Sequence, residues 1–146
     1  MSRKTTQTVS GAAAILVNPD HQVLLQQRDE KPGLPLAGWW TLFGGRAEPG
    51  ETPDENIRRE LTEELEIPPE VRWWKMYQHG PYDRDGLQIV VNQHIYVGRV
   101  DLPENEIVFH EGQAVKFVSR DELNTMRIAF GFDELLRGFF EQGVTP

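Results

Sequence analysis

The sequence predicts a single domain of the α/β (α+β) class, built from packed layers of sheet and helix. Three observations predict this class: several strand-like stretches, one central helix with clear boundary signals, and a closing amphipathic helix. The 146 residues suffice for one domain with its own hydrophobic core. We find no internal repeat or long linker, so residues 1–146 are expected to form one unit.

The expected strands are short apolar or aromatic runs bounded by turn residues. They are residues 8–17, 22–28, 39–43, 71–78, 87–100 and 114–118. Asn18-Pro19-Asp20 predicts a hairpin between the first two strands, and turn residues at 83–86 separate the fourth from the fifth. Residues 1–7 are polar and are expected to form a flexible N-terminus. Residues 31–38 are expected to form a loop because they include two prolines and two glycines.

The central helix has signals at both ends. Thr52 can act as N-cap, Pro53 suits the first helical position, and Glu55 completes a capping box. An aliphatic stripe recurs at four-residue intervals, at Ile57, Leu61 and Leu65. Pro68-Pro69 is expected to stop the helix. Two more helices are expected, a short one at 121–123 capped by Ser119 and an amphipathic one at 132–141.

Composition excludes several functional classes. The formal net charge of −8 argues against polymeric nucleic acid, whose binding relies on Lys and Arg contacts to phosphates. A small phosphorylated substrate is compatible with this charge, because divalent cations can supply positive charge locally. No apolar run approaches the roughly 18 residues of a membrane span, so no membrane partner is expected. The absence of cysteine excludes disulfides and thiolate chemistry and suits a cytoplasmic location.

An ordered pattern of acidic residues lies on the central helix. On an ideal helix Glu60, Glu63 and Glu64 fall at i, i+3 and i+4, so their side chains converge on one sector. Like charges at this spacing repel unless a cation neutralises them, and Mg²⁺ prefers oxygen ligands. The glycines before the helix, Gly44 and Gly45, permit backbone conformations that bring a carbonyl to the same ion. Acidic clusters alone usually belong to solvated helices, but this ordered spacing favours a metal site.

A further pair is expected to support that site. Arg59 lies on another part of the helix surface, from which it can reach back to Glu51. Such a charge-assisted pair would hold the preceding loop against the helix.

This stretch resembles the Nudix box, which reads Gly, five residues, Glu, seven residues, then Arg-Glu-aliphatic-x-Glu-Glu-x-Gly-aliphatic. The matching positions are Gly45, Glu51, Arg59, Glu60, Leu61, Glu63, Glu64 and Ile67. Glu66 stands where the family usually has Gly, a helix-terminating position, so this departure concerns the turn more than the chemistry. Phe43 stands where relatives often have Pro, a difference expected to bear on substrate choice and substrate binding.

The resemblance covers most of the chain and implies a Nudix-type α/β/α sandwich with a mixed β-sheet between helices. It implies a metal-dependent hydrolase that cleaves a phosphoanhydride bond in a nucleoside diphosphate linked to another moiety. A nucleoside triphosphate or its oxidised form is slightly favoured as substrate. Nucleotide sugars and dinucleoside polyphosphates are close rivals.

The resemblance also implies roles for individual residues. Mg²⁺ or Mn²⁺ would be held by the Gly45 carbonyl and by the carboxylates of Glu60, Glu63, Glu64 and Glu111. The expected catalytic carboxylates are those of Glu60, Glu63 and Glu111, and the sequence does not decide whether Glu60 or Glu111 is the general base. Arg28 resembles a phosphate-contacting arginine of some members, with a plain surface arginine as the alternative. Glu51 and Arg59 would be structural support.

Other functions of the same fold are weaker alternatives. A non-catalytic, nucleotide-sensing Nudix domain tends to lose box glutamates, whereas Glu60, Glu63 and Glu64 are all present. The isomerase branch generally needs a catalytic cysteine, and this chain has none. The oligomeric state is left open, a homodimer included.

Two groups of side chains are expected to be structural by default. Six aromatic residues could offer a base-stacking surface, but at strand and helix spacing they are more often core. They are Trp39, Trp40, Trp73, Trp74, Phe130 and Phe132. The histidines have no metal-ligand spacing, which predicts structural or surface roles. They are His21, His79, His94 and His110.

Overall fold

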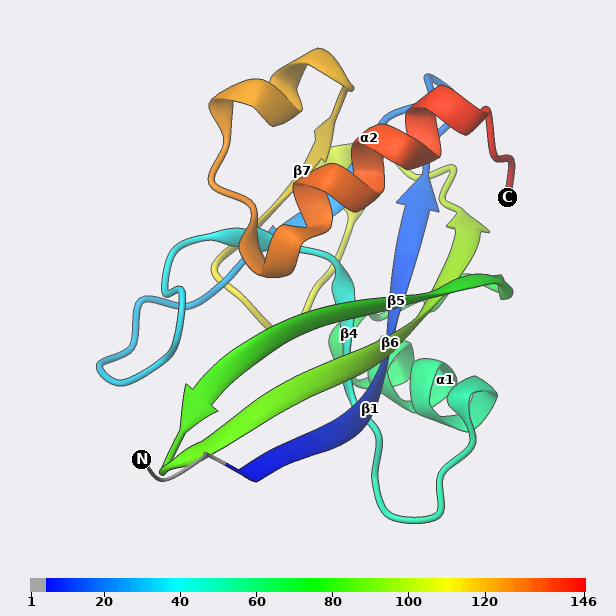
Figure 1. Cartoon of the computed structure of the whole chain (residues 1–146). Helices are drawn as coiled ribbons and strands as arrows, with labels where there is room; N and C mark the ends of the chain where they lie inside the picture. Colours follow the sequence, from blue (N-terminus) through cyan, green and yellow to red (C-terminus); the bar gives the residue numbers. More distant parts are fainter. Residues whose placement is uncertain (1–4) are drawn as a thin grey trace.

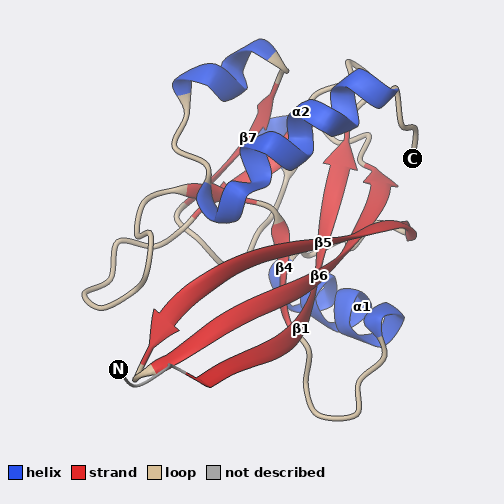
Figure 2. Cartoon of the chain, viewed as in Figure 1, coloured by secondary structure: helices blue, strands red, loops and turns tan. Residues whose placement is uncertain are grey.

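The computed structural model describes residues 5–146, which form a mixed seven-stranded sheet with helices on both faces (Figures 1 and 2). The strands are β1 (Thr5–Val17), β2 (Val23–Gln27), β3 (Trp40–Thr41), β4 (Phe43–Arg46), β5 (Val71–Arg84), β6 (Leu87–Arg99) and β7 (Ala114–Val118). The main order is β3-β2-β1-β6-β5, while β4 pairs with β1 and β7 pairs with β2. β1 runs parallel to β6, and the other strand pairs are antiparallel.

β1 lies at the centre because its second half is apolar on both faces, the pattern of a strand covered on both sides. Alternate residues Ala12, Ala14 and Leu16 join the cluster that contains Ile57 and Leu61 of α1 (Pro53–Glu64). The intervening residues Ala13, Ile15 and Val17 join the cluster that contains α2 (Phe132–Gln142). This arrangement confirms the predicted α/β/α layers.

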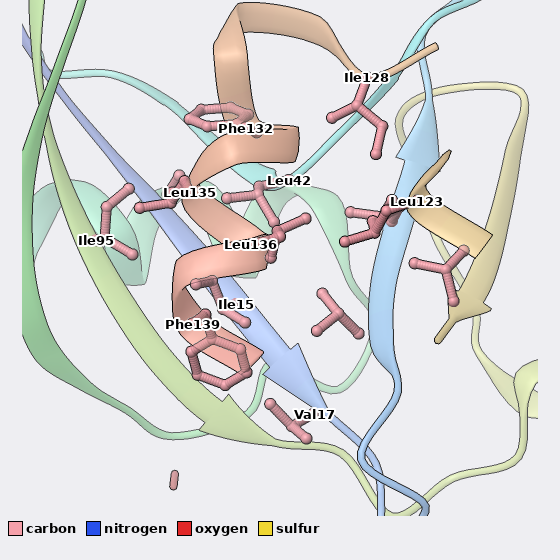
Figure 3. Close-up of a cluster of buried hydrophobic side chains, with 14 of the residues drawn as sticks. Ile15, Val17, Leu42, Ile95, Leu123, Ile128, Phe132, Leu135, Leu136 and Phe139 are labelled. Carbon is pink, nitrogen blue, oxygen red and sulfur yellow. The ribbon is translucent and has the colours of Figure 1, made fainter. Parts of the chain in front are cut away.

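The core under α2 explains the amphipathic pattern of that helix. Its buried residues recur at helical spacing and pack on Ile15 and Ile95 of the sheet (Figure 3). They are Phe132, Leu135, Leu136 and Phe139. The described residues also form three short 3₁₀ helices: η1 (Glu104–Glu106), η2 (Asp121–Thr125) and η3 (Ala129–Gly131). Leu123 of η2 and the residue before η3, Ile128, close the edge of this core.

α1 begins as predicted and ends earlier than predicted. The Glu55 N–H donates to Thr52 Oγ1 at 3.2 Å and the Thr52 N–H donates to Glu55 Oε1 at 3.0 Å, so the capping box is present. The helix ends at Glu64, before the two prolines, because Leu65 turns to extended backbone. There Leu65 forms a β-bridge with Phe109. Pairing of Leu65 with another segment therefore ends the helix, and no glycine is needed at position 66.

The first predicted hairpin is present as an antiparallel pair, but its pairing is confined to the residues beside the turn. Asn18 Oδ1 accepts the N–H groups of Asp20 and Gln22, but only Val17 and Val23 pair between β1 and β2. β6 occupies one edge of β1 and β4 occupies part of the other, so β2 diverges to pair with β3 and β7.

Three other strand assignments also differ from the prediction. Residues 5–7 were expected to be flexible but pair with residues 87–89 at the start of β1, whereas residues 1–4 lie outside the described residues. β5 continues beyond its predicted end at residue 78 to Arg84, because a register shift between His79 and Tyr82 accommodates Gly80-Pro81. The predicted aromatic strand at 39–43 is divided into β3 and the start of β4. No helix in the described part of the chain is long and apolar enough to cross a membrane.

Candidate active site

Three carboxylates converge where α1 meets the loop before β7. One oxygen each from Glu60, Glu64 and Glu111 lies within 4.8 Å of the other two. Glu60 and Glu64 stand one turn apart on α1, while Glu111 comes from a loop far along the chain. The structure thus joins three of the four carboxylates that the sequence nominated.

Glu64 is fully buried and has no cationic partner among the described residues. Its carboxyl accepts hydrogen bonds from the Gly44 N–H at 3.2 Å and from Gln26 Nε2 at 3.2 Å. Burial raises the pKa of Glu64 far above its ordinary value, and the nearby carboxyls of Glu60 and Glu111 raise it further. A buried acid surrounded by other acids favours either a proton or a cation at this place.

The backbone before α1 fits closely against this group. A Cβ on Gly45 would lie 2.5 Å from Glu60 Oε1, so only glycine leaves room for that carboxylate. Asn56 Nδ2 lies 3.4 Å from the Gly45 carbonyl oxygen. The other amide atom, Asn56 Oδ1, is buried and has no hydrogen-bond partner in the described structure. An unpaired buried oxygen here is a second sign that the site suits a cation.

Arg59 makes the contacts predicted for it. Its Nε and Nη2 atoms donate to the two oxygens of Glu51 at 2.7 and 2.9 Å, a bidentate pair. Nη2 also donates to the Arg46 carbonyl at 3.1 Å, and Nη1 donates to Glu60 at 3.0 Å. The hydrogen bond from Arg59 lowers the pKa of Glu51. Arg59 therefore connects the loop before α1 to a carboxylate of the site.

Glu63 and Glu111 differ in position from Glu64. The Glu63 side chain is 58% exposed and lies 3.4 Å from Arg59 Nη1, outside the group of three. The pKa of the Glu111 carboxyl is raised, first by burial and then by the charges of Glu60, Asp29 and Glu63. A role for Glu63 as a metal ligand stays a prediction.

The two predicted substrate-binding residues have different positions. Arg28 follows β2, where its guanidinium lies 5.2 Å from the centre of the Phe130 ring and close enough to Glu111 for their charges to interact. Phe43 is completely buried and packs with Ile57 and Leu61 beneath α1. The prediction of substrate contact by the Phe43 side chain is therefore wrong, because strand alternation at β4 turns it into the core.

The family follows from comparison with known proteins. The model of the NUDIX domain matches residues 7–139. The chain belongs to the Nudix family. It is 31% identical over 123 residues to the nucleoside triphosphatase NudI of Enterobacter sp. (strain 638), covering 77% of this chain and 82% of that one.

Two further matches agree with the Nudix assignment. A putative 8-oxo-dGTP diphosphatase of Bacillus subtilis is 41% identical over 54 residues, which are 37% of this chain and 32% of that protein. The crystal structure of the MutT protein from Methanosarcina mazei Go1 has a TM-score of 0.75 at 20% identity, covering 99% of this chain and 100% of that one. This structural match shows the same fold.

Sequence reasoning missed two polar residues that contact the Nudix box. Asn56 lies one turn before Glu60 and two turns before Glu64, so its helical spacing could have indicated it. Gln26 in β2 is also buried and bonds to Glu64, but nothing in its local sequence distinguishes it.

The Glu66 departure from the Nudix box has a structural counterpart. Glu66 Oε2 lies 2.6 Å from His110 Nε2. Two backbone hydrogen bonds join the same two segments. The Glu66 N–H donates to the Val108 carbonyl at 3.0 Å, and the His110 N–H donates to the Glu64 carbonyl at 2.8 Å. The segment before Glu111 is thereby fastened to the end of α1, which holds Glu111 beside Glu64.

Glu66→Ala is expected to weaken Mn²⁺ binding about two- to fivefold, because the Glu66–His110 pair is exposed and exposed pairs contribute little. The dissociation constant can be measured by electron paramagnetic resonance of free Mn²⁺. The matched control is Glu70→Ala, which removes an exposed acid outside the site. Equal affinities of both variants and the wild type would show that the backbone bonds alone position Glu111.

Proposed function

We propose that this Nudix hydrolase cleaves a phosphoanhydride bond of a nucleoside triphosphate or a related nucleotide, with Mg²⁺ or Mn²⁺ bound at Glu60, Glu64 and Glu111. The observation that carries the proposal is the meeting of these three carboxylates around a buried Glu64 that has no cationic side chain beside it among residues 5–146. Support for the substrate class comes from the relatives, named a nucleoside triphosphatase and a putative 8-oxo-dGTP diphosphatase.

The residues present fit a hard divalent cation. All three side-chain donors are carboxylate oxygens, the ligand type that Mg²⁺ and Mn²⁺ prefer over sulfur or imidazole. The Gly45 carbonyl oxygen lies 3.4 Å from Asn56 Nδ2, and the unpaired Oδ1 of the same amide adds another oxygen nearby. A bound ion would neutralise phosphate charge and activate the attacking water.

Side chains of the protein would accept a proton from the attacking water and bind the phosphates. Glu60 is held by Arg59, whereas the carboxylate of Glu111 accepts no hydrogen bond from residues 5–146. Glu111 is also the exposed member of the three, so its carboxylate can reach the attacking water. We therefore assign Glu111 as the general base. Arg28, whose charge interacts with that of Glu111, would bind a phosphate of the substrate. The enzyme is proposed to act as one cytoplasmic domain.

The test is a panel of nucleoside triphosphates, nucleotide sugars and dinucleoside polyphosphates, assayed with Mg²⁺ and with EDTA. We expect turnover of a nucleoside triphosphate only with the metal. Glu111→Gln should lower kcat by about 100-fold and remove the acidic limb of the pH–rate profile. The control is Glu106→Gln, an exposed acid of η1. Binding without turnover in the whole panel would favour a sensor, and full activity of Glu111→Gln would exclude this base.

A further inference from the structure

The side chain of Gln26 lies between the segments that carry the carboxylates of the site. It projects from β2 on the same face as Leu24, which packs with Ile57 and Leu61 beneath α1. Only 5% of Gln26 is exposed. Burial of an amide costs free energy unless its polar atoms are paired. The contacts of this amide therefore show what a polar group does at a position where the neighbouring residues are apolar.

The amide nitrogen of Gln26 connects the Glu64 carboxyl to the sheet. Nε2 donates to Glu64 Oε2 at 3.2 Å and to the Leu42 carbonyl oxygen at 3.3 Å. Leu42 lies between β3 and β4, so strand pairing on both sides fixes its carbonyl. The Glu64 carboxyl also accepts from the Gly44 N–H at 3.2 Å, a backbone group of β4. Gln26 is therefore a side chain through which the sheet sets the orientation of Glu64.

The same side chain borders the loop that carries Glu111. A Cβ on Gly112, the next residue, would lie 3.0 Å from Gln26 Oε1 and 2.7 Å from the Gln27 carbonyl oxygen. The φ of Gly112 is 82°, so both its conformation and its surroundings favour glycine. The Gln113 N–H then donates to the Gln27 carbonyl at 2.9 Å, which holds the loop against β2. Gln26 thus has α1 on the side of its Nε2 and the Glu111 loop on the side of its Oε1.

The lack of charge on Gln26 is as important as its position. An amide donates to a carboxylate without neutralising it, whereas a lysine or arginine at this place would form an ion pair with Glu64. Among residues 5–146, Glu64 accepts no hydrogen bond from a cationic side chain. Arg59 on the same helix donates to Glu51 and Glu60 instead. The charge that neutralises Glu64 is therefore left for a bound cation to supply.

We propose that Gln26 is a positioning residue of the metal site. Its amide orients the Glu64 carboxyl toward Glu60 and Glu111, keeps α1 and the Glu111 loop at a fixed separation, and leaves Glu64 for a divalent cation to neutralise. The inference rests on the proposed function, because it concerns the cation that hydrolysis would use. Two properties of Gln26 carry it, the donors on the amide and the absence of charge, and each is removed by a different substitution.

Gln26→Met tests the donors, because methionine keeps the length of the side chain and removes the amide. We expect the dissociation constant for Mn²⁺, measured without substrate by electron paramagnetic resonance of the free ion, to rise about tenfold. The matched control is Gln27→Met, the same change at the next residue of β2. The Gln27 side chain lies on the other face of the strand and donates to the Gly38 carbonyl at 3.1 Å. Its variant should bind Mn²⁺ like the wild type.

Gln26→Lys tests the charge, because lysine keeps N–H donors and adds a positive charge beside Glu64. We expect Mn²⁺ binding to weaken by at least about 100-fold. The midpoint of thermal unfolding in EDTA should rise by about 3 °C above the wild type, since the ammonium then neutralises Glu64 in the metal-free protein. Gln26→Met should show no such rise. Equal Mn²⁺ affinities of Gln26→Lys and Gln26→Met would overturn the role assigned to the missing charge.

The rate as a function of Mg²⁺ concentration separates positioning of the metal site from a general structural role. Gln26→Met should need about tenfold more Mg²⁺ for half-maximal activity and keep kcat within about threefold at saturation, because the bound ion itself orients Glu64. A lower kcat at an unchanged Mg²⁺ requirement would overturn the inference, as would wild-type Mn²⁺ affinity in Gln26→Met. Weaker Mn²⁺ binding by Gln26→Met, with no turnover of any nucleotide by the wild type, would support the positioning role and overturn the proposed hydrolysis.

Discussion

Glu64→Gln is expected to lower hydrolysis by about 1000-fold, roughly 4 kcal/mol, and yet to stabilise the protein prepared without metal. Glutamine keeps an oxygen that can accept from the Gly44 N–H, so the local structure is retained. It removes the ionisable group that burial and its acidic neighbours oppose. This combination is expected of a buried metal-binding carboxylate, which destabilises the folded protein when no ion is bound.

The stabilisation should depend on pH in a defined direction. Because burial raises the pKa of Glu64, the folded metal-free protein binds more protons than the unfolded chain at pH values between the ordinary pKa and the raised one. Wild-type stability from this group is therefore highest below the ordinary value and falls as pH rises through that window. Glutamine does not titrate, so the advantage of Glu64→Gln should grow with pH and reach about 1 to 3 kcal/mol at mildly alkaline pH.

Urea unfolding in EDTA at a series of pH values measures this difference, with Glu70→Gln as an exposed control. Adding Mn²⁺ should stabilise the wild type and the control but not Glu64→Gln, because binding to the folded state adds to stability. A variant less stable than the wild type at every pH would show that Glu64 is satisfied without a cation.

Local sequence signals predicted the elements that depend on local physics. The capping box at Thr52 and Glu55 and the apolar spacing of α2 concern residues within a few positions of one another, and both appear where expected. The first hairpin pairs only next to its turn, because strand pairing is a competition among distant segments, and β4 and β6 take the rest of β1.

The same distinction holds at the site. Glu60 and Glu64 share a helix face, and helical spacing alone predicts that they converge. That Glu111 joins them was expected from resemblance, and no spacing rule within this chain connects it to α1.

Gly44→Ala is expected to destabilise the fold by more than about 3 kcal/mol, whereas Gly45→Ala should fold and lose metal affinity. A Cβ on Gly44 would lie 2.1 Å from the Ala12 carbonyl oxygen and 2.6 Å from the Ala13 Cα, and its φ of 144° is unfavourable for alanine. Those obstacles are backbone atoms of β1, fixed by pairing with β4. Relief would require the two strands to separate, which places the cost among the largest for single substitutions.

At Gly45 the obstacle is a side chain, which makes the neighbouring glycine a matched control. Its Cβ would approach the carboxylate of Glu60, which can rotate away and leave the group formed with Glu64 and Glu111. Thermal unfolding in EDTA should show a midpoint roughly 10 °C lower for Gly44→Ala and nearly unchanged for Gly45→Ala. Mn²⁺ titration of Gly45→Ala should give at least about tenfold weaker binding. Tight Mn²⁺ binding by Gly45→Ala would mean that Glu60 reaches the ion from another rotamer, and an unchanged midpoint for Gly44→Ala would contradict the close contact of β4 with β1.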